Sequence, residues 1–238
     1  MHTASEAIVL QRYPYKDKSA VVKLYTMQLG LVSCWVNSVH GKKSKTKSAI
    51  LQPFSVINAE ILHNETNALY RLKEISMAAS TQNIHTNIEK TTIAIFISEL
   101  LSHCIKESST DHSLYKFIKG VIMLLDNTGE LCKNFHLVFM VRLCEHLGFL
   151  PAGNYSGSTP YFNLTESIFQ KVPPFHPNYL DNEKGKLFSE LIALPMDKFF
   201  TISVTAQMRK SLVASLLEYY IIHTGMSPLK SHYVFEDL

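Results

Sequence analysis

The sequence lacks the features of membrane, secreted and zinc-ribbon proteins. Its 238 residues include only four cysteines, and no two of them form the CxxC pair that zinc ribbons and redox motifs require. No apolar run approaches the roughly 20 residues of a membrane span, and residues 1–6 show neither region of a secretory signal. We therefore expect a cytoplasmic protein without membrane contact, whose thiols are buried rather than bound to metal. These cysteines are Cys34, Cys104, Cys132 and Cys144.

The familiar catalytic motifs are absent as well. The sequence contains no GxxxxGKS/T, GxGxxG, GxSxG, HExxH or KxDG motif. Its eleven histidines are dispersed. The tight acid–histidine pairings, Glu99 with His103 and Glu145 with His146, fall in predicted helices, where packing or surface roles are the usual ones. The sequence therefore predicts a protein that is not an enzyme and has no cofactor and no metal site.

Acidic residues are scarce in the first third of the chain. None occurs between Asp17 and Glu60, and residues 1–80 carry ten lysines and arginines against five acids, a net charge of +5. The remainder carries thirteen against fifteen, a net charge of −2. This asymmetry indicates a polyanionic partner for the N-terminal part. A solvated basic face explains the same charges equally well.

Five short runs rich in aliphatic and aromatic residues fill this basic part, and proline, glycine and asparagine separate them. The runs are residues 5–10, 21–25, 31–36, 54–62 and 68–75. Five strands in so short a segment predict a small closed barrel of the OB type rather than a sandwich.

Helical periodicity begins after residue 80. Apolar residues at three- and four-residue steps predict helices at 89–106, 113–126, 131–147, 182–194 and 204–223. Residues 151–177 contain five prolines and predict an irregular excursion with at most a short strand pair near 161–169. The predicted fold class is therefore α+β, with an N-terminal five-stranded OB-type barrel at 1–80 and a helical domain at 81–238.

Two clusters of cations are candidates for DNA binding. Segment 37–48 contains four lysines, whose long side chains contact phosphates without fixed geometry. Segment 12–18 interleaves cations with Tyr13 and Tyr15, a pattern that allows base stacking, although packing on the barrel accounts for these tyrosines equally well. Strand alternation adds further cations, whereas Trp35 is expected in the core. The predicted DNA-binding residues are Arg12, Tyr13, Lys16, Lys18, Lys23, Lys42, Lys43, Lys45, Lys47, Arg71 and Lys73.

Several stretches resemble the RecO family of bacterial recombination mediators. They are residues 6–26, the Gly30 turn, the Gly41-Lys-Lys-Ser-Lys loop, 51–54, 142–151, 208–220 and 229–231. The resemblance covers essentially the full chain. It implies an OB-fold domain followed by a helical domain, binding of single- and double-stranded DNA, strand annealing in double-strand-break and gap repair, and a nucleoid-associated location. It also implies partnership with RecR and single-stranded DNA-binding protein during RecA loading.

The resemblance bears on two further sites. Many members carry a four-cysteine zinc site after the central helix, but residues 152–162 here contain no cysteine, so we expect no zinc and an excursion held by its aromatic residues. The family also binds the acidic, apolar-ended C-terminal tail of single-stranded DNA-binding protein on its helical domain. Arg142 and Arg209, with Lys210 at the rim, are the hypothetical anchors; pairing of Arg142 with Glu145 is an equal alternative.

Two other functions stay open at this point. The chain could be a helical protein-interaction adaptor whose barrel is a scaffold that does not bind DNA. It could also be an enzyme that acts on nucleic acid without a familiar motif. The first would show no salt-dependent DNA affinity, and the second would show metal- or nucleotide-dependent turnover.

Overall fold

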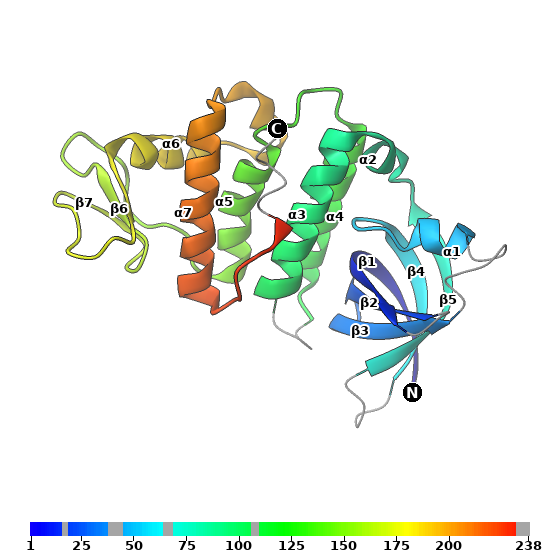
Figure 1. Ribbon diagram of the computed structural model, residues 1–238. Helices are drawn as coiled ribbons and strands as arrows, with labels where there is room; N and C mark the ends of the chain where they lie inside the picture. Colours follow the sequence, from blue (N-terminus) through cyan, green and yellow to red (C-terminus); the bar gives the residue numbers. More distant parts are fainter. Residues whose placement is uncertain (16–18, 38–44, 64–68, 106–109, 232–238) are drawn as a thin grey trace. The chain divides into compact units, whose positions relative to one another are not determined.

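The computed structural model describes residues 1–15, 19–37, 45–63, 69–105 and 110–231, with side chains in the third segment described from Ser48 onward. Contacts within the chain define two compact units, Met1–Thr128 and Gly129–Leu238 (Figure 1). Each unit is considered by itself below. Among the described residues, no helix combines the length and apolar character that a membrane span requires.

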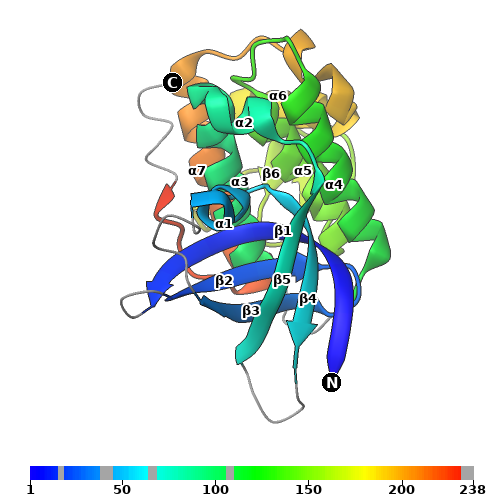
Figure 2. The same ribbon diagram turned by 90° about the vertical axis from the view of Figure 1, so that its right-hand side faces the viewer.

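Five strands of the first unit close into a barrel in the order β1-β2-β3-β5-β4, and Figure 2 shows them crossing one another around it. All neighbouring strands are antiparallel except β3 and β5, which run parallel. The predicted five-stranded barrel is therefore confirmed. The strands are β1 (His2–Tyr15), β2 (Ser19–Thr26), β3 (Gly30–Asn37), β4 (Val56–Leu62) and β5 (Leu69–Ala79).

Strand β1 is longer than the apolar run that predicted it. It continues through Pro14, where the sequence pattern indicated a break. Pairing with β4 covers only His2 to Ile8, so the last residues of β1 have a single neighbour, β2. Proline is tolerated there because one side of the strand needs no hydrogen bond.

A short helix, α1 (Lys45–Ile50), joins the barrel and was not predicted. Leu51, which follows it, is fully buried in the barrel core, and Ile50 packs against the same core. The apolar end of this lysine-rich segment therefore contributes to the barrel core. Phe54 then adopts a positive φ of 67°, and its amide donates to the Val9 carbonyl at 2.8 Å.

Three helices complete the first unit: α2 (Gln82–Thr86), α3 (Ile88–Cys104) and α4 (His112–Asn127). The predicted helices at 89–106 and 113–126 are confirmed. Asn87 caps α3 by accepting the Lys90 amide, and Asp111 caps α4 by accepting two amides of its first turn. These caps explain why both helices begin where they do.

Contacts between α4 and the barrel explain why helices fall within the first unit. Glu6 of β1 accepts a hydrogen bond from the Tyr115 hydroxyl at 3.1 Å and forms a 2.8 Å ion pair with Lys119. The Tyr25 hydroxyl donates to the Asp111 carbonyl at 3.2 Å. The compact unit defined by contacts thus ends at Thr128. The domain boundary at residue 80 that the sequence suggested stays a prediction.

The second unit consists of helices and a small sheet, β7-β6-β8. The predicted strand pair is present, and the two-residue β8 extends it to three strands. Gly148, with a φ of 81°, ends α5 in the left-handed conformation that glycine adopts without strain. The elements are α5 (Phe135–Leu147), β6 (Tyr161–Asn163), β7 (Ile168–Gln170), β8 (Tyr179–Leu180), α6 (Asn182–Ala193), the 3₁₀ turn η1 (Met196–Thr201) and α7 (Ala206–Thr224).

Aromatic rings attach this sheet to the helices. The fully buried Phe162 ring of β6 has its centroid 4.9 Å from that of Phe169, 4.8 Å from Phe188 of α6 and 5.8 Å from Tyr219 of α7. The part of the chain that the structure describes contains no group of three metal-ligating side chains placed to hold an ion. The residues of the excursion therefore do not fit a zinc site, and the absence of zinc stays a prediction.

The packing of α6 beside β6 leaves no room for a side chain at Gly185. A Cβ at this position would lie 2.6 Å from the Pro160 carbonyl oxygen, a backbone atom that cannot rotate away. We expect Gly185→Ala to lower the free energy of unfolding by about 1–3 kcal/mol, because overpacking exceeds the gain in helix propensity. Gly120→Ala, in α4, is the matched control. A Cβ there meets nothing within 4 Å, so thermal denaturation should show this variant to be as stable as the wild type or more so.

Candidate nucleic-acid interface

The registers of four barrel strands align one row of side chains across the sheet. Tyr13 of β1 pairs with Val21 of β2, Val21 pairs with Trp35 of β3, and Trp35 pairs with Arg71 of β5. Directly paired residues point to the same side of a sheet. This side is the outer one, because the alternating residue Cys34 belongs to the barrel core. We call Tyr13, Val21, Trp35 and Arg71 the cross-strand row.

Members of the cross-strand row are accessible to a ligand. The Tyr13 side chain is 50% exposed, Arg71 is exposed, and Val21 and Trp35 are partly exposed. The prediction that Trp35 lies in the core was therefore wrong, because strand alternation turns its neighbours inward instead. The Arg71 guanidinium carbon lies 5.2 Å from the Trp35 ring centroid, a cation–π arrangement. The row thus combines two aromatic rings with a cation.

Segment 12–18 does not form a single cluster of cations and rings. Arg12 pairs with Val22, a core residue, and so lies on the opposite face of β1 from Tyr13. Its guanidinium donates to the carbonyl and hydroxyl oxygens of Ser48 at 3.1 and 2.6 Å. Arg12 thus ties β1 to α1 while remaining exposed. Lys16 and Lys18 lie outside the described residues.

Lys23 and Tyr25 are covered by helices. The Lys23 ammonium donates to the Ser102 carbonyl in the last turn of α3 at 2.6 Å. The Tyr25 side chain is buried, with its ring centroid 5.9 Å from that of Tyr115 in α4. Helices thus cover the part of this strand face that carries Lys23 and Tyr25, whereas Val21 on the same face stays partly exposed, and Lys23 is not part of the surface proposed below.

The structure describes only some of the remaining predicted cations. Lys42 and Lys43 lie outside the described residues, and Lys45 and Lys47 belong to α1 with side chains outside the description. Lys73 of β5 is exposed. A register shift opposite Glu60 and Ile61 makes it the extra residue of a bulge. The alternation that placed Lys73 beside Arg71 is therefore interrupted.

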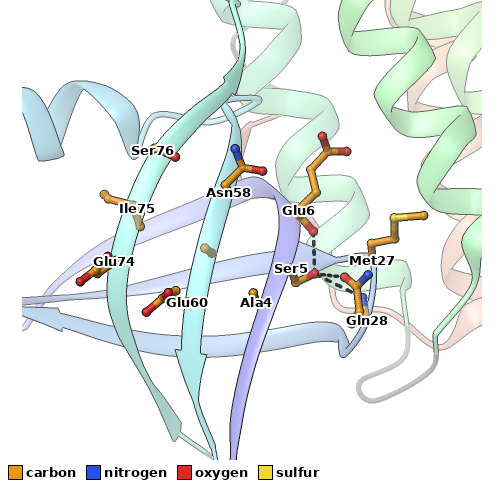
Figure 3. A pocket seen from close by; sticks show the side chains of 11 residues that line it. Ala4, Ser5, Glu6, Met27, Gln28, Asn58, Glu60, Glu74, Ile75 and Ser76 are labelled. Atoms are coloured by element: carbon orange, nitrogen blue, oxygen red, sulfur yellow. Dashed lines mark hydrogen bonds between the residues drawn. The ribbon is translucent and has the colours of Figure 1, made fainter.

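Another wall of the barrel is acidic and unsuited to phosphate. A hollow of about 460 Å³ lies over β1, β4 and β5, and Figure 3 shows Glu6, Glu60 and Glu74 among its lining residues. Lys119 pairs with Glu6, and His2 lies 3.2 Å from Glu60. Because the carboxylates would repel a nucleic-acid backbone, this wall is less suited to DNA binding than the cross-strand row.

The charge near the cross-strand row is also uneven. Burial, followed by the negative charge of Glu99 in α3, raises the pKa of the Tyr13 hydroxyl. Gln11, two residues before Tyr13, accepts a hydrogen bond from the Ser102 hydroxyl of the same helix at 2.9 Å. Helix α3 therefore borders one side of the row with an acid. The other side of the row is bordered by the paired strand ends Tyr15, Ser19 and Asn37.

A serine–histidine pair in the second unit is not arranged for nucleophilic catalysis. The Ser167 hydroxyl lies 3.1 Å from Nε2 of His223, and Ser167 has a positive φ of 56°. The same Nε2 lies 2.7 Å from the Leu164 carbonyl oxygen, which can only accept a hydrogen bond. Nε2 therefore carries the ring hydrogen and cannot take a proton from Ser167.

The three predicted partner-binding residues occupy different environments. Arg142 of α5 donates to the carbonyls of Ile192 at 2.9 Å and Leu194 at 3.0 Å. It thus caps the C-terminal end of α6, an arrangement that neither the tail hypothesis nor pairing with Glu145 anticipated. Sequence reasoning missed this role because the carbonyls come from a segment about 50 residues away.

Arg209 and Lys210 lie at the start of α7. Arg209 is only 6% exposed, and its guanidinium lies 3.4 Å from both the Asn134 amide oxygen and the Val204 carbonyl. Burial, followed by the charge of Arg209, lowers the pKa of His136 to about 3, so this histidine is neutral. Lys210 is exposed. Asn134 precedes α5, and Arg142 follows it along that helix by about 12 Å; binding of one tail by both arginines stays a prediction.

Comparison with known proteins gives the family. Residues 1–81 match the model described as recombination protein O N terminal, and residues 85–232 match recombination protein O C terminal. The DNA repair protein RecO of Flavobacterium psychrophilum is 33% identical over 241 residues, covering 100% of this chain and 99% of that protein. The RecO proteins of Flavobacterium johnsoniae, 31% identical with 100% and 99% coverage, and Bacteroides fragilis, 29% identical with 97% and 96% coverage, are also similar. The resemblance seen in the sequence is thus confirmed, and the chain belongs to the RecO family of DNA repair proteins.

Proposed function

We propose that this protein is a DNA-binding recombination mediator that holds strands through the outer face of its barrel and performs no covalent chemistry. The observation that carries the proposal is the cross-strand row, a partly exposed face with two aromatic rings and Arg71 on a barrel whose sequence has no acid between Asp17 and Glu60. Aromatic and cationic side chains on one sheet face suit nucleic acid. The acidic wall over β4 and β5 is unfavourable for binding a nucleic-acid backbone.

The wider role extends from this binding. We infer annealing of single strands and assistance to RecA loading in double-strand-break and gap repair, together with RecR and the C-terminal tail of single-stranded DNA-binding protein. Binding to DNA would place the protein with the bacterial nucleoid. For the acidic tail, the start of α7 is the better candidate, because Lys210 is exposed there while Arg142 already caps α6. The lysines of segment 42–47 are proposed phosphate contacts.

A salt titration tests DNA binding. The variant with Lys42, Lys43, Lys45 and Lys47 replaced by alanine should bind more weakly than wild type. The slope of log affinity against log salt should shrink by up to about 0.7 per lost contact on single strands and about 0.9 on duplex. The measurement is fluorescence anisotropy with labelled oligonucleotides at several salt concentrations.

A matched variant controls for total charge. Lys133, Lys171, Lys186 and Lys198 are exposed in the second unit, and replacing these four by alanine should leave the slope unchanged. Equal slopes for wild type and both variants would contradict the lysine assignment. Salt-independent or absent DNA binding would favour the alternative function, a protein-interaction adaptor with a scaffold barrel.

A further inference from the structure

We propose that copies of this protein associate head to tail, with loop 171–178 of one copy seated in two neighbouring hollows along β5 of the next. The occupant of both hollows is thus a second copy of this chain. The loop belongs to the second compact unit and both hollows belong to the first. The inference goes beyond the proposed DNA binding and does not depend on it.

Loop 171–178 is held firmly at both ends. It connects β7 to β8, and both of these strands pair with β6. The Gln170 side-chain amide donates to the Val172 carbonyl at 2.6 Å, and the Leu164 amide donates to the Asn178 carbonyl at 3.0 Å. Between these ends lie three prolines, each with a fixed φ. The loop is therefore ordered before a partner binds, which lowers the entropic cost of binding.

Phe175 projects from this loop into solvent. Among the large apolar side chains that the structure describes it is the most exposed, and Val172 is 62% exposed. The chain bends on either side of the two central prolines, so the loop is not the straight helix that proline-binding grooves take. An ordered loop with an exposed ring instead suits an apolar pocket. Lys171 is exposed and no acid occurs in residues 167–180, so this pocket should lie beside negative charge.

Two hollows with these properties border consecutive parts of β5. Residues 74–76 line the hollow of about 460 Å³ described above, which we call the acidic hollow. Residues 77–80 line a second hollow of about 370 Å³, which we call the apolar hollow. Met77, at 42% exposure, and two alanines contribute its apolar surface. Methionine suits an aromatic ligand, because its side chain is flexible and its sulfur attracts the edge of a ring.

The acidic hollow contains an unfavourable pair of charges. Glu60 of β4 is paired directly with Glu74 of β5 (Figure 3), and like charges in this position destabilise a sheet. His2 lies 3.2 Å from Glu60, whereas Glu74 is exposed and forms no ion pair with any residue that the structure describes. A lysine from a second copy would relieve this repulsion.

The loop matches the two hollows in length. From Glu74 to Ala78, strand β5 advances by four residues, about 13 Å. Lys171 and Phe175 are also four residues apart, and the chain between them spans at most about 14 Å. The long lysine side chain compensates for the bends in the loop. A loop that lies along β5 can therefore place Phe175 in the apolar hollow and Lys171 beside Glu60 and Glu74.

This contact joins two different surfaces, so each copy carries one loop and one pair of hollows. Such a heterologous contact leaves a free loop at one end of the assembly and free hollows at the other, where further copies can add. A single loop buries little surface, so the association is expected to be weak. The size of the assembly should therefore rise with protein concentration.

Sedimentation velocity of the full-length protein without DNA tests the proposal. We expect the average sedimentation coefficient of the wild type to rise with concentration. Phe175→Ala should weaken the association roughly 10- to 100-fold, because it removes the ring that would be buried. Glu74→Lys should weaken it by charge repulsion with Lys171, and thermal transitions verify that both variants are folded.

Matched variants control for the loss of a ring and for the reversal of a charge. Phe200→Ala removes another exposed ring of the second unit, and Glu145→Lys reverses another exposed carboxylate there. Both should associate like the wild type. The double variant with Lys171→Glu and Glu74→Lys exchanges the two charges, and it should regain part of the association that each single change removes.

A mixing experiment tests whether the contact is head to tail. Phe175→Ala keeps both hollows, and Glu74→Lys keeps the loop. Each variant alone should stay monomeric at concentrations where the wild type associates. An equimolar mixture should form dimers and nothing larger, because only one intact loop and one intact pair of hollows are then available per pair of chains.

Three results would overturn the proposal. The first is a wild-type sedimentation coefficient that does not change with concentration. The second is association that Phe175→Ala leaves as strong as in the wild type, and the third is a mixture of the two folded variants that stays monomeric. None of these results bears on the salt titration of DNA binding, so the proposed function is tested separately.

Discussion

Replacing Phe162 with alanine should lower the free energy of unfolding by about 3–5 kcal/mol, the usual cost of truncating a buried phenylalanine. Phe162 is fully buried, and its ring contacts those of Phe169, Phe188 and Tyr219. It thereby joins β6 to β7, α6 and α7. Thermal denaturation followed by circular dichroism would measure the loss.

The control for this variant is Phe175→Ala, which removes a ring of the same size from a solvent-exposed position in the same excursion. Its transition should match the wild type. A chelator should also leave the wild-type transition unchanged, because we expect ring packing rather than a metal to hold the three-stranded sheet. A large drop in stability with the chelator, or stoichiometric zinc in the purified protein, would refute this account.

Arg142→Ala should lower the free energy of unfolding by about 2–4 kcal/mol. The guanidinium donates to the carbonyls of Ile192 and Leu194, where α6 ends and carbonyls have no partner within the helix. Hydrogen bonds from a charged donor are individually stronger than neutral ones, and removing the donor leaves acceptors unsatisfied. Denaturant unfolding of the purified variant would check the value.

Arg142→Lys distinguishes capping from tail binding. Lysine keeps the positive charge but loses the planar fork that bonds two carbonyls at once. We expect stability to fall. Affinity for an acidic, apolar-ended tail peptide should stay within about twofold of wild type, a change of about 0.4 kcal/mol, because a side chain that caps α6 does not contact the peptide. A stable Arg142→Lys protein that no longer binds the peptide would reverse the assignment and restore Arg142 as a tail anchor.

Local sequence signals were sufficient for most elements of the fold. Alternating apolar residues marked the barrel strands, and three- and four-residue periodicity marked α3 to α7 within a few residues. The signals failed where tertiary contacts overrode local preference. Pro14 ends no strand because β1 has one neighbour there, and α1 forms in a lysine-rich segment that leads into the buried Leu51.

The candidate site was harder to predict because its geometry depends on distant partners. Sequence reasoning singled out Tyr13 and Arg71 separately, but the parallel pairing of β3 with β5, which sets Trp35 beside Arg71, has no local signature. Likewise, Lys23 and Arg142 look like free surface cations until the carbonyls of Ser102 and Ile192 are placed beside them. A count of charges cannot separate phosphate contacts from helix caps.

The bonds from the barrel to α4 have a consequence for folding during synthesis. Glu6 and Tyr25 leave the ribosome before their partners Tyr115, Lys119 and Asp111, which follow about a hundred residues later in the chain. Contacts of such long sequence separation form slowly and late. The barrel of the nascent chain therefore keeps a carboxylate and a tyrosine uncovered until residues 111–119 have left the ribosome, and chaperone contact during that interval would fall on this face.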